Sequence, residues 1–410
     1  MKQRILPVCA LLLLPALAPA QSDVKLELVA KDASSITGYY YPLRIELGNA
    51  RPASLKKLPP KLAAPRYGVL PVTSEGGRKF HVIVDEPAGA DAVLYVDTNG
   101  DGDLTNDAPT EWKPSRDAKG LTTWMGGATV SLAADGKTID VHLGMYRFDP
   151  TDPSRQQLKN TLLYYRDYAR QGTLSFGDRS YRVLLVDEKA TGDFRTGEVA
   201  LLVDLNADGR FTTPRESIST AEPFNVGGTT WEIADMSRFG DSFRVVKSAK
   251  TTAEILPPPD HAVGKTITAF TATDMDGKAV RFPADFAGKV VMLDFWATWC
   301  GPCMSEVPGL VAAWAKYQAK GFEVLGISLD QAGQADAVRK VLKDKGMGWR
   351  QVYDGGYWKA AIAQLYVVDS IPAAYLVDGD TGEILALGGS LRGSALAGSV
   401  EQALKKKGKL

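Results

Sequence analysis

The sequence predicts a multi-domain protein in which an α/β domain at residues 262–410 follows a β-rich region with an internal duplication. Three observations lead to this fold class. Strand-like and helix-like runs alternate after residue 262, which is the pattern of an α/β domain. Short apolar runs separated by glycine turns fill the region before residue 250. A proline-rich stretch at 251–261 separates the two parts and is typical of a stiff linker.

Residues 1–20 have the features of a secretory signal peptide. Lys2 and Arg4 form a charged start, an apolar segment follows, and Ala18-Pro19-Ala20 is a cleavage site of small residues. The apolar segment is too short to span a bilayer. We therefore expect cleavage near Ala20 and a periplasmic or secreted protein. Cleavage would leave a single pair of cysteines in the mature chain.

Two β-rich repeats are predicted, at residues 21–150 and 151–250, because the same landmarks occur twice in the same order. Each repeat holds a hairpin with a glycine turn, an apolar strand that leads into an acidic loop, and a pair of glycines with a strand. The landmarks are the hairpins at 68–86 and 172–188, the acidic loops at 97–102 and 204–209, and the glycine pairs at 126–127 and 227–228.

Both acidic loops begin with the pattern Asp-x-Asn-x-Asp-Gly, in which oxygens at positions 1, 3 and 5 of a calcium loop converge on one cation. The candidate metal ligands are Asp97, Asn99, Asp101, Asp204, Asn206 and Asp208. The glutamate of position 12 is missing, and Ala108 and Arg215 stand there instead. An acidic turn without a metal begins in the same way. The sequence is therefore compatible with two interpretations of these loops, weak calcium binding and a simple turn that binds no metal.

Composition narrows the choice of partners. The chain has 48 basic and 48 acidic side chains, and this balance does not support binding to nucleic acid, which requires a basic surface. No run of 18 apolar residues follows the signal segment, so we expect no transmembrane helix. His81, His142 and His261 are too scattered along the chain to predict a metal cluster.

The C-terminal domain is organised around the dithiol sequence Cys300-Gly301-Pro302-Cys303. It lies between a run typical of a buried strand, residues 289–295, and a run typical of a helix, residues 304–320. The first sulfur is then at a helix N-terminus, where unpaired N–H groups and the helix dipole favour a thiolate. The second sulfur can form a disulfide with it. Pro302 falls in the first helical turn, where the missing N–H costs no hydrogen bond.

Other uses of a Cys-x-x-Cys pair are less consistent with this sequence. A zinc site needs two further ligands at similar spacing, and none occurs. Haem attachment needs a histidine directly after the second cysteine, where Met304 stands. A structural pair would not need the Gly-Pro insert. A peroxidatic cysteine would have proline and threonine ahead of it at other offsets. The sequence therefore favours redox chemistry.

Strands and helices are predicted to alternate along the rest of this domain, with helices on both faces of the sheet. The predicted strands are 290–295, 322–328, and the hairpin of 373–377 with 383–388; the predicted helices are 306–320, 335–345, 358–365 and 394–406.

Residues 262 to about 404 resemble the thioredoxin superfamily, and within it the periplasmic branch that includes TlpA and ResA. The sequence Trp299-Cys300-Gly301-Pro302-Cys303 is similar to the active site of the family. Asp294 matches the buried acid of thioredoxin, and Glu306 matches the acid typical of the TlpA and ResA branch. Ile371-Pro372 matches the cis-proline that faces the disulfide. The resemblance does not extend to the β-rich region.

The resemblance implies a periplasmic thiol-disulfide oxidoreductase that requires no cofactor. Cys300 is expected to be the exposed attacking thiolate and Cys303 the resolving thiol. Asp294 and Glu306 are candidates to accept the proton of Cys303, because burial beside a thiol raises the pKa of a carboxyl. Glu306 has a second interpretation, as an acid that complements the helix dipole. Pro372 is expected to block metal binding and to pair with an extended substrate.

The Gly-Pro dipeptide resembles that of thioredoxin and predicts a reductase that acts on disulfide-bonded proteins. Its electrons would come from a membrane thiol donor of the DsbD or CcdA type, as the family likeness implies. Two other functions stay open. In the first, the β-rich region is a binding module for an envelope ligand, with or without a dependence on calcium, and the redox domain is accessory. In the second, the enzyme is a disulfide isomerase or a peroxidase.

Overall fold

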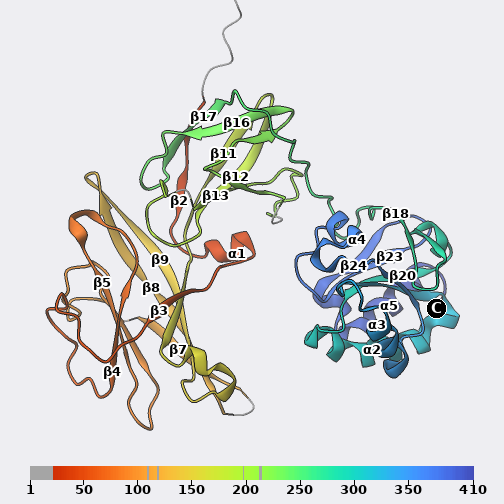
Figure 1. Ribbon diagram of the computed structural model, residues 1–410, viewed down its shortest axis with the longest axis horizontal. Helices are drawn as coiled ribbons and strands as arrows, with labels where there is room; N and C mark the ends of the chain where they lie inside the picture. Colours follow the sequence, from red (N-terminus) through yellow and green to blue (C-terminus); the bar gives the residue numbers. More distant parts are fainter. Residues whose placement is uncertain (1–21, 109, 118–119, 197, 212–214) are drawn as a thin grey trace, which may run out of the picture. The chain divides into compact units, whose positions relative to one another are not determined.

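The computed structural model describes residues 22–108, 110–117, 120–196, 198–211 and 215–410, which form two compact units (Figure 1). Unit 1 holds the described residues up to 203 together with 218–255. Unit 2 holds the described residues of 204–217 together with 256–410. The predicted signal peptide lies outside the described residues.

The regular secondary structure of unit 1 is almost entirely β-strand, and the strands that the structure describes form four sheets. The strand orders are β3-β10-β9-β8-β7, β14-β13-β12-β11-β2, β1-β17-β16-β15 and β4-β5-β6. Its strands are β1 (Ser22–Lys25), β2 (Glu27–Val29), β3 (Leu43–Glu46), β4 (Pro65–Leu70), β5 (Phe80–Asp85), β6 (Val93–Val96), β7 (Glu111–Arg116), β8 (Thr122–Ala134), β9 (Lys137–Phe148), β10 (Thr161–Arg166), β11 (Ala169–Phe176), β12 (Arg179–Asp187), β13 (Val199–Val203), β14 (Ser217–Ser219), β15 (Phe224–Val226), β16 (Thr229–Ala234) and β17 (Ser242–Lys247). The described residues also include the short helix α1 (Ala33–Thr37) and the 3-10 turns η1 (Glu75–Gly77) and η2 (Pro153–Leu158).

The two predicted hairpins are present. β4 pairs with β5, and β11 pairs with β12, both antiparallel. β6 and β13 extend the two hairpins, and each leads into an acidic loop. The glycine pairs differ, however. Gly126 and Gly127 lie inside the long strand β8, whereas Gly227 and Gly228 form the turn between β15 and β16. The duplication as a whole therefore stays a prediction.

Close backbone packing explains the glycines inside β8. A Cβ atom added at Gly126 would lie 1.6 Å from the carbonyl oxygen of Glu111 on the neighbouring strand β7. A Cβ atom at Gly127 would lie 2.3 Å from the carbonyl oxygen of Leu143 on β9. Both positions therefore need glycine because backbone occupies the space of a side chain, not because the chain turns there.

The sheets of unit 1 cross the boundary that was predicted at residue 150. β10, which follows this boundary, pairs with both β3 and β9. β1 and β2 begin the described chain, yet they pair with β17 and β11. Pairing in this way covers sheet edges with strands from distant parts of the sequence. Strands from residues 21–150 and strands from residues 151–250 therefore belong to the same sheets.

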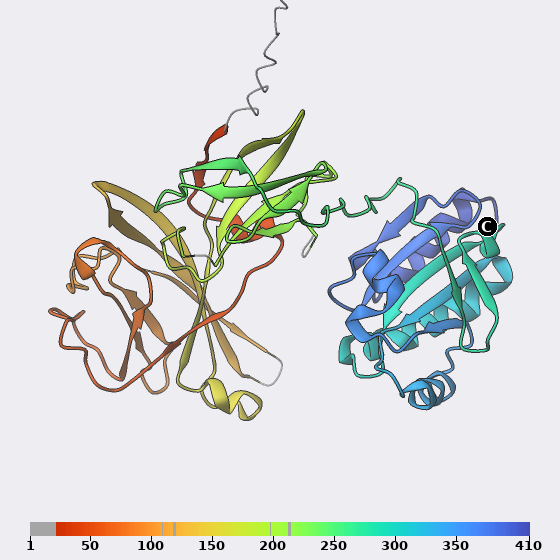
Figure 2. The same ribbon diagram turned by 45° about the horizontal axis from the view of Figure 1, so that its top comes forward.

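Unit 2 is built on a sheet that Figure 2 shows in teal and blue. The strand order of this sheet is β22-β21-β20-β23-β24. β20 is parallel to β21, and β21 is parallel to β22, whereas β23 is antiparallel to both β20 and β24. The strands are β20 (Val290–Trp296), β21 (Phe322–Ser328), β22 (Arg350–Tyr353), β23 (Ala373–Asp378) and β24 (Ile384–Leu387). Every residue of β20 is buried, which explains its nearly continuous apolar run.

The helices of unit 2 overlap the predicted ranges, but the helix predicted at 358–365 is a 3-10 turn followed by a helix of five residues. The helices are α2 (Gly301–Tyr317), α3 (Ala335–Lys345), α4 (Ala361–Leu365) and α5 (Ala395–Lys406), with the 3-10 turns η3 (Ala284–Phe286), η4 (Gln318–Lys320), η5 (Tyr357–Lys359) and η6 (Gly388–Leu391). α2 begins at Gly301, earlier than the pattern predicted. β22 and the hairpin of β18 (Phe270–Thr273) with β19 (Ala279–Phe282) were not predicted from the sequence. These strands are only four residues long, so they offer little periodicity to detect.

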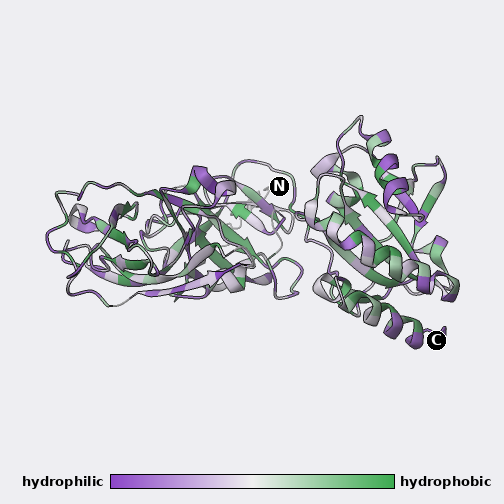
Figure 3. Cartoon of the chain, turned by 90° about the horizontal axis from the view of Figure 1, so that it is seen from below, coloured by the Kyte–Doolittle hydropathy of each residue, from purple (hydrophilic) through white to green (hydrophobic). Residues whose placement is uncertain are grey.

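The last helix shows how the apolar pattern positions an element. α5 buries Leu396, Val400, Ala403 and Leu404, a spacing that places them on one helical face. Its last turn is basic and hydrophilic, as Figure 3 shows next to the C-terminus. α5 packs against α2 and β20, so it supports the dithiol helix from behind. None of the helices described is both long enough and apolar enough to cross a lipid bilayer.

Candidate active site

Cys300 and Cys303 form a disulfide at the start of α2. Cys300 is the N-cap residue, and its Sγ accepts a hydrogen bond from the backbone N–H of Cys303 at 3.1 Å. The same Sγ lies 3.7 Å from the carbonyl oxygen of Ile371, which precedes the cis peptide bond to Pro372. The structure therefore brings the predicted proline loop against the predicted dithiol, although the two are about 70 residues apart in the sequence.

The expectation that Cys300 is exposed is wrong for the oxidised pair. Cys300 is 4% exposed and Cys303 is 3% exposed. The loop of Ile371 lies against the Sγ of Cys300, while the neighbouring Trp299 is the exposed residue, at 46%. The position of Cys300 still distinguishes it from Cys303, because the first N–H groups of a helix stabilise a thiolate at the N-cap.

Asp294 lies on β20 and is buried. Burial raises the pKa of its carboxyl from 3.8 to about 7; the nearby positive charge of Arg392 opposes this increase, and Glu306 adds to it. Asp294 lines a cavity of about 30 Å³ together with Cys303, Glu306, Pro372 and Arg392. A cavity of this size can hold one water molecule. A carboxyl with this pKa can therefore exchange a proton at neutral pH within a site that includes the second cysteine.

Glu306 and Arg392 connect the helix of the dithiol to the proline loop. Glu306 lies in the second turn of α2, and its Oε2 accepts a hydrogen bond from the N–H of Gly393 at 2.8 Å. The guanidinium of Arg392 donates to the carbonyl oxygen of Pro372. Glu306 thus has a specific partner besides the helix dipole. Arg392 was not predicted as a site residue, because it lies in a segment without a motif and far from the cysteines in the sequence.

A buried carboxylate also holds the segment that precedes Cys300. Asp330 follows β21, and its two carboxylate oxygens accept hydrogen bonds from the N–H of Thr298 at 3.1 and 3.2 Å. The hydroxyl of Ser328 donates to Asp330 at 2.8 Å. Because β20 and β21 are parallel, their carboxyl ends meet at the same edge of the sheet. Asp330 therefore fixes the turn between β20 and α2.

An aromatic cluster lies beside the disulfide. The ring centroid of Trp299 is 5.3 Å from that of Tyr357 and 5.8 Å from that of Trp358. Tyr357 has a φ of 55°, in the left-handed region that non-glycine residues adopt rarely. The motif contains Trp299, but no sequence signal indicated the other two rings. Such a cluster gives a polypeptide substrate an apolar surface next to the reactive sulfur.

The two acidic loops have the same hydrogen bonds. In each loop the N–H at position 5 donates to the side chains at positions 1 and 3, and the N–H at position 6 donates to the side chain at position 1. The first loop does so with Asp97, Asn99, Asp101 and Gly102, at 2.9–3.2 Å. The second does so with Asp204, Asn206, Asp208 and Gly209, at 3.1 Å. These bonds satisfy backbone donors, as in an acidic turn.

Among the described residues no group of three or more His, Cys, Asp or Glu side chains is placed to hold a metal ion. The first loop also has a contact that was not predicted from the sequence. Asp97 lies 3.1 Å from the Nδ1 of the buried His81, and the other ring nitrogen of His81 lies 2.8 Å from the hydroxyl of Ser54. His81 is therefore part of a polar network rather than an isolated strand residue, and calcium binding stays a prediction.

Comparisons with known proteins concern unit 2. Residues 263–385 match the AhpC/TSA family. The thiol-disulfide oxidoreductase ResA of Bacillus thuringiensis subsp. konkukian is 32% identical over 144 residues, which cover 35% of this chain and 78% of that protein. ResA of Geobacillus thermodenitrificans is 32% identical over 117 residues, 28% of this chain and 64% of that protein. The crystal structure of the thioredoxin domain of a thiol-disulfide oxidoreductase from Bacteroides vulgatus has 31% identity, covers 35% of this chain and 98% of that chain, and has a TM-score of 0.31.

Unit 2 is thus a thioredoxin-like domain in which Cys300 and Cys303 form a disulfide, and the protein is an oxidoreductase. The chain belongs, through this domain, to the thiol-disulfide oxidoreductases of the ResA and TlpA type. The resemblance expected from the motif is confirmed. The matched residues account for about a third of the chain, so this identification does not extend to unit 1.

Proposed function

We propose that the protein is an extracytoplasmic disulfide reductase that works through the Cys300-Gly301-Pro302-Cys303 dithiol. The observation that carries the proposal is the site around the second cysteine. Cys303 shares a small cavity with Asp294, a buried carboxyl whose pKa is raised to about 7. A dithiol that releases reduced product needs a base at this place, because the resolving thiol must lose its proton before it attacks.

The first step is the attack of Cys300 on the substrate. In the reduced enzyme the Cys300 thiolate attacks one sulfur of a protein disulfide, a bond forms between the two sulfurs, and the other substrate sulfur leaves as a thiolate. The N–H of Cys303, which points to the Sγ of Cys300, stabilises the negative charge before the attack. The aromatic cluster around Trp299 and the backbone beside Pro372 are placed to contact the substrate chain.

The second step returns the enzyme to the state seen in the structure. Asp294, as a carboxylate, accepts the proton of the Cys303 thiol across the small cavity. The Cys303 thiolate then attacks the Sγ of Cys300, and the second substrate sulfur leaves as a thiolate. Two electrons have passed from the dithiol to the substrate. A donor dithiol must reduce the Cys300–Cys303 disulfide again, and we propose a membrane thiol protein of the DsbD or CcdA type for this role.

The direction of the reaction is tested by the reduction potential of the Cys300–Cys303 couple, measured by equilibration of the full chain with glutathione. We expect a value near that of thioredoxin, about −270 mV, because the Gly-Pro dipeptide is the same. A value near that of DsbA, about −120 mV, would overturn the reductase proposal and make the protein an oxidant.

Turnover measurements separate reduction from the other two activities. We expect insulin reduction to be lost in Cys300→Ser and kept in Ser305→Ala, a control on the exposed side of the same helical turn. Rescue of scrambled ribonuclease without net reduction would favour an isomerase. Consumption of peroxide at a rate comparable to that of disulfide reduction would favour a peroxidase. Secretion of the full-length chain with loss of the first 20 residues tests the extracytoplasmic location.

We further propose that the two acidic loops bind calcium weakly, because two separate loops share one arrangement of side-chain oxygens. The missing carboxylate at position 12 places the expected Kd at about 10⁻⁴ to 10⁻³ M. Millimolar calcium should then raise the melting temperature of the full chain, since a ligand of the native state stabilises it by mass action. Asp97→Asn combined with Asp204→Asn should abolish this increase. Identical melting curves with calcium and with chelator would show that the loops are turns only.

A further inference from the structure

A buried carboxylate lies next to the turn that leads into the dithiol helix. Asp330 is 1% exposed and follows β21, and the groups that donate to its side chain are all neutral. The N–H of Thr298 is shared between its two oxygens, and the hydroxyls of Thr298 and Ser328 donate at 2.5 and 2.8 Å. Hydrogen bonds to a carboxylate favour its charged form. Asp330 therefore brings a negative charge into unit 2, with no cation among its hydrogen-bond partners in the described part of the chain.

The segment that Asp330 holds leads directly into Cys300. Thr298 is two residues before Cys300, so the chain between them spans at most about 7 Å. The intervening Trp299 donates through its indole N–H to the carbonyl oxygen of Leu329 at 3.3 Å. The N–H of Leu329 donates in turn to the last residue of β20 at 2.8 Å. These bonds fix the two segments against each other, so the charge of Asp330 stays within short range of the Cys300 sulfur.

Two opposing influences therefore act on a thiolate at Cys300. The N–H of Cys303, at 3.1 Å from the Sγ of Cys300, stabilises a negative charge on that sulfur. A negative charge nearby has the opposite effect, because like charges disfavour each other's charged form. Three other charged groups near the pair line the small cavity of Cys303, which Cys300 does not line; they are Asp294, Glu306 and Arg392. Asp330 thus acts on the first cysteine from a different side of the site.

We propose that Asp330 is a positioning residue whose negative charge destabilises the Cys300 thiolate and so makes the reduced dithiol a stronger electron donor. A couple whose reduced form is stabilised is a strong oxidant, as in DsbA, and a destabilised thiolate has the reverse effect. Asp330 forms no bond to the substrate and exchanges no proton in the reaction. The inference deepens the proposed reductase function, on which it rests only for the direction of electron flow.

The test compares Asp330→Asn with the unchanged full chain. Asparagine keeps an oxygen for the N–H of Thr298, and the hydroxyls of Thr298 and Ser328 can turn to accept from its amide, so the substitution removes mainly the charge. The pKa of Cys300 is obtained from the pH dependence of its alkylation by iodoacetamide, followed by mass spectrometry. We expect this pKa to fall by about half a unit to one unit, since a like charge has been removed.

The second measurement is the equilibrium of the dithiol with glutathione at pH 8. In Asp330→Asn we expect the equilibrium constant to move roughly threefold to tenfold toward the reduced dithiol, which corresponds to a reduction potential higher by about 15–30 mV. If Asp330→Asn does not fold, Asp330→Ser removes the same charge and keeps a hydroxyl that can accept from the N–H of Thr298.

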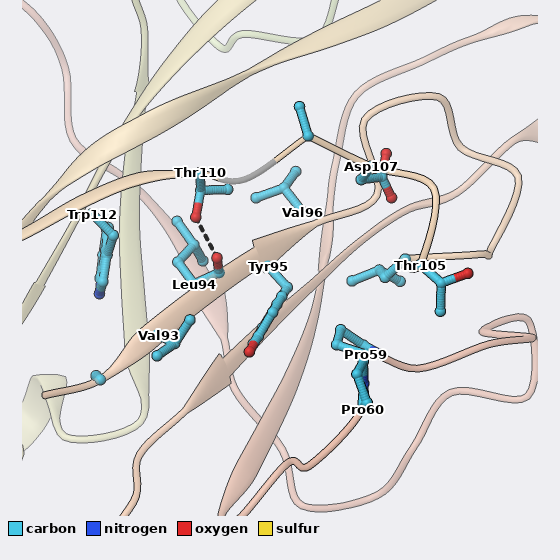
Figure 4. A pocket seen from close by; sticks show the side chains of 13 residues that line it. Pro59, Pro60, Val93, Leu94, Tyr95, Val96, Thr105, Asp107, Thr110 and Trp112 are labelled. Carbon is cyan, nitrogen blue, oxygen red and sulfur yellow. Dashed lines mark hydrogen bonds between the residues drawn. The ribbon is translucent and has the colours of Figure 1, made fainter. Parts of the chain in front are cut away.

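Two control variants separate the charge from the hydrogen bonds. Thr298→Val removes the hydroxyl that donates to Asp330 but keeps the charge. Asp107 accepts from the N–H and hydroxyl of Thr98 just as Asp330 does from those of Thr298, but it belongs to unit 1, beside the cavity along β6 that Figure 4 shows. Asp107→Asn therefore removes a similarly bonded carboxylate from the other unit. Both controls should keep the potential of the unchanged protein.

Equal potentials of Asp330→Asn and the unchanged protein would overturn the inference. A shift of the same size and direction in Thr298→Val would also overturn it, because the effect would then come from the geometry of the turn. The comparison is separate from the test of the reductase proposal. A potential of the unchanged protein near that of DsbA would refute that proposal, whereas the difference between Asp330→Asn and the unchanged protein tests the role of Asp330 alone.

Discussion

Asp294→Asn should make the protein more stable above neutral pH, although it removes a residue of the active site. The carboxyl of Asp294 is buried on β20, and burial raises its pKa from 3.8 to about 7. In the folded protein the group therefore keeps a proton that the unfolded chain releases near pH 4. Asparagine occupies the same space and never ionises, so the substitution removes the free-energy cost of a buried charge.

The sign and size of the effect follow from the two pKa values. Between about pH 4 and pH 7 the folded state binds more protons than the unfolded state, so the free energy of unfolding falls as the pH rises. This loss is complete above pH 7. Across about three pH units the free energy of unfolding falls by about 4 kcal/mol, because each unit of pKa shift corresponds to about 1.4 kcal/mol. At pH 4 both states carry the proton to a large extent, and Asp294→Asn should change stability little.

The measurement is calorimetric unfolding of the oxidised full chain at several pH values between 4 and 8. We expect the transition of unit 2 in Asp294→Asn to move to higher temperature at pH 8 and to match the unchanged protein at pH 4. Asp344→Asn is the control, because Asp344 is exposed and its pairing with Lys340 is worth at most about 0.5 kcal/mol. Equal pH dependence of the unchanged protein and Asp294→Asn would refute the assignment of a raised pKa to this carboxyl.

Three further predictions concern the reaction steps. Cys303→Ser should accumulate a mixed disulfide between Cys300 and the substrate, which mass spectrometry detects; rapid product release by this variant would contradict the order of the two steps. Glu306→Gln should slow the resolving step and change its pH profile while the fold is kept, since the glutamine oxygen can still accept from the N–H of Gly393. An unchanged profile would assign Glu306 to the helix dipole alone. Arg392→Met should move the pH profile of the resolving step to higher pH, because the charge of Arg392 lowers the pKa of Asp294; a move to lower pH would exclude this electrostatic role.

The chemistry of the dithiol could be predicted from the sequence because it depends on neighbouring residues. A buried strand, two cysteines three apart and a proline in the first helical turn are local features, and together they place a sulfur at a helix N-terminus. The same holds for the hairpins β4–β5 and β11–β12, in which the turn and both strands lie close together in the chain. Asp294, Glu306 and Pro372 were predicted from the family motif, and the structure places them around one small cavity.

The sequence alone did not determine contacts between distant segments. The position of Arg392 against Pro372 depends on how α5 packs behind α2 and β20. The burial of Cys300 depends on the proline loop, and the pKa of Asp294 depends on everything that excludes water from β20. In unit 1, β10 could be assigned to β3 and β9 only by tertiary structure. Such contacts arise from packing and hydrogen bonding across the whole domain. The composition of a segment does not indicate which distant segment will pack against it.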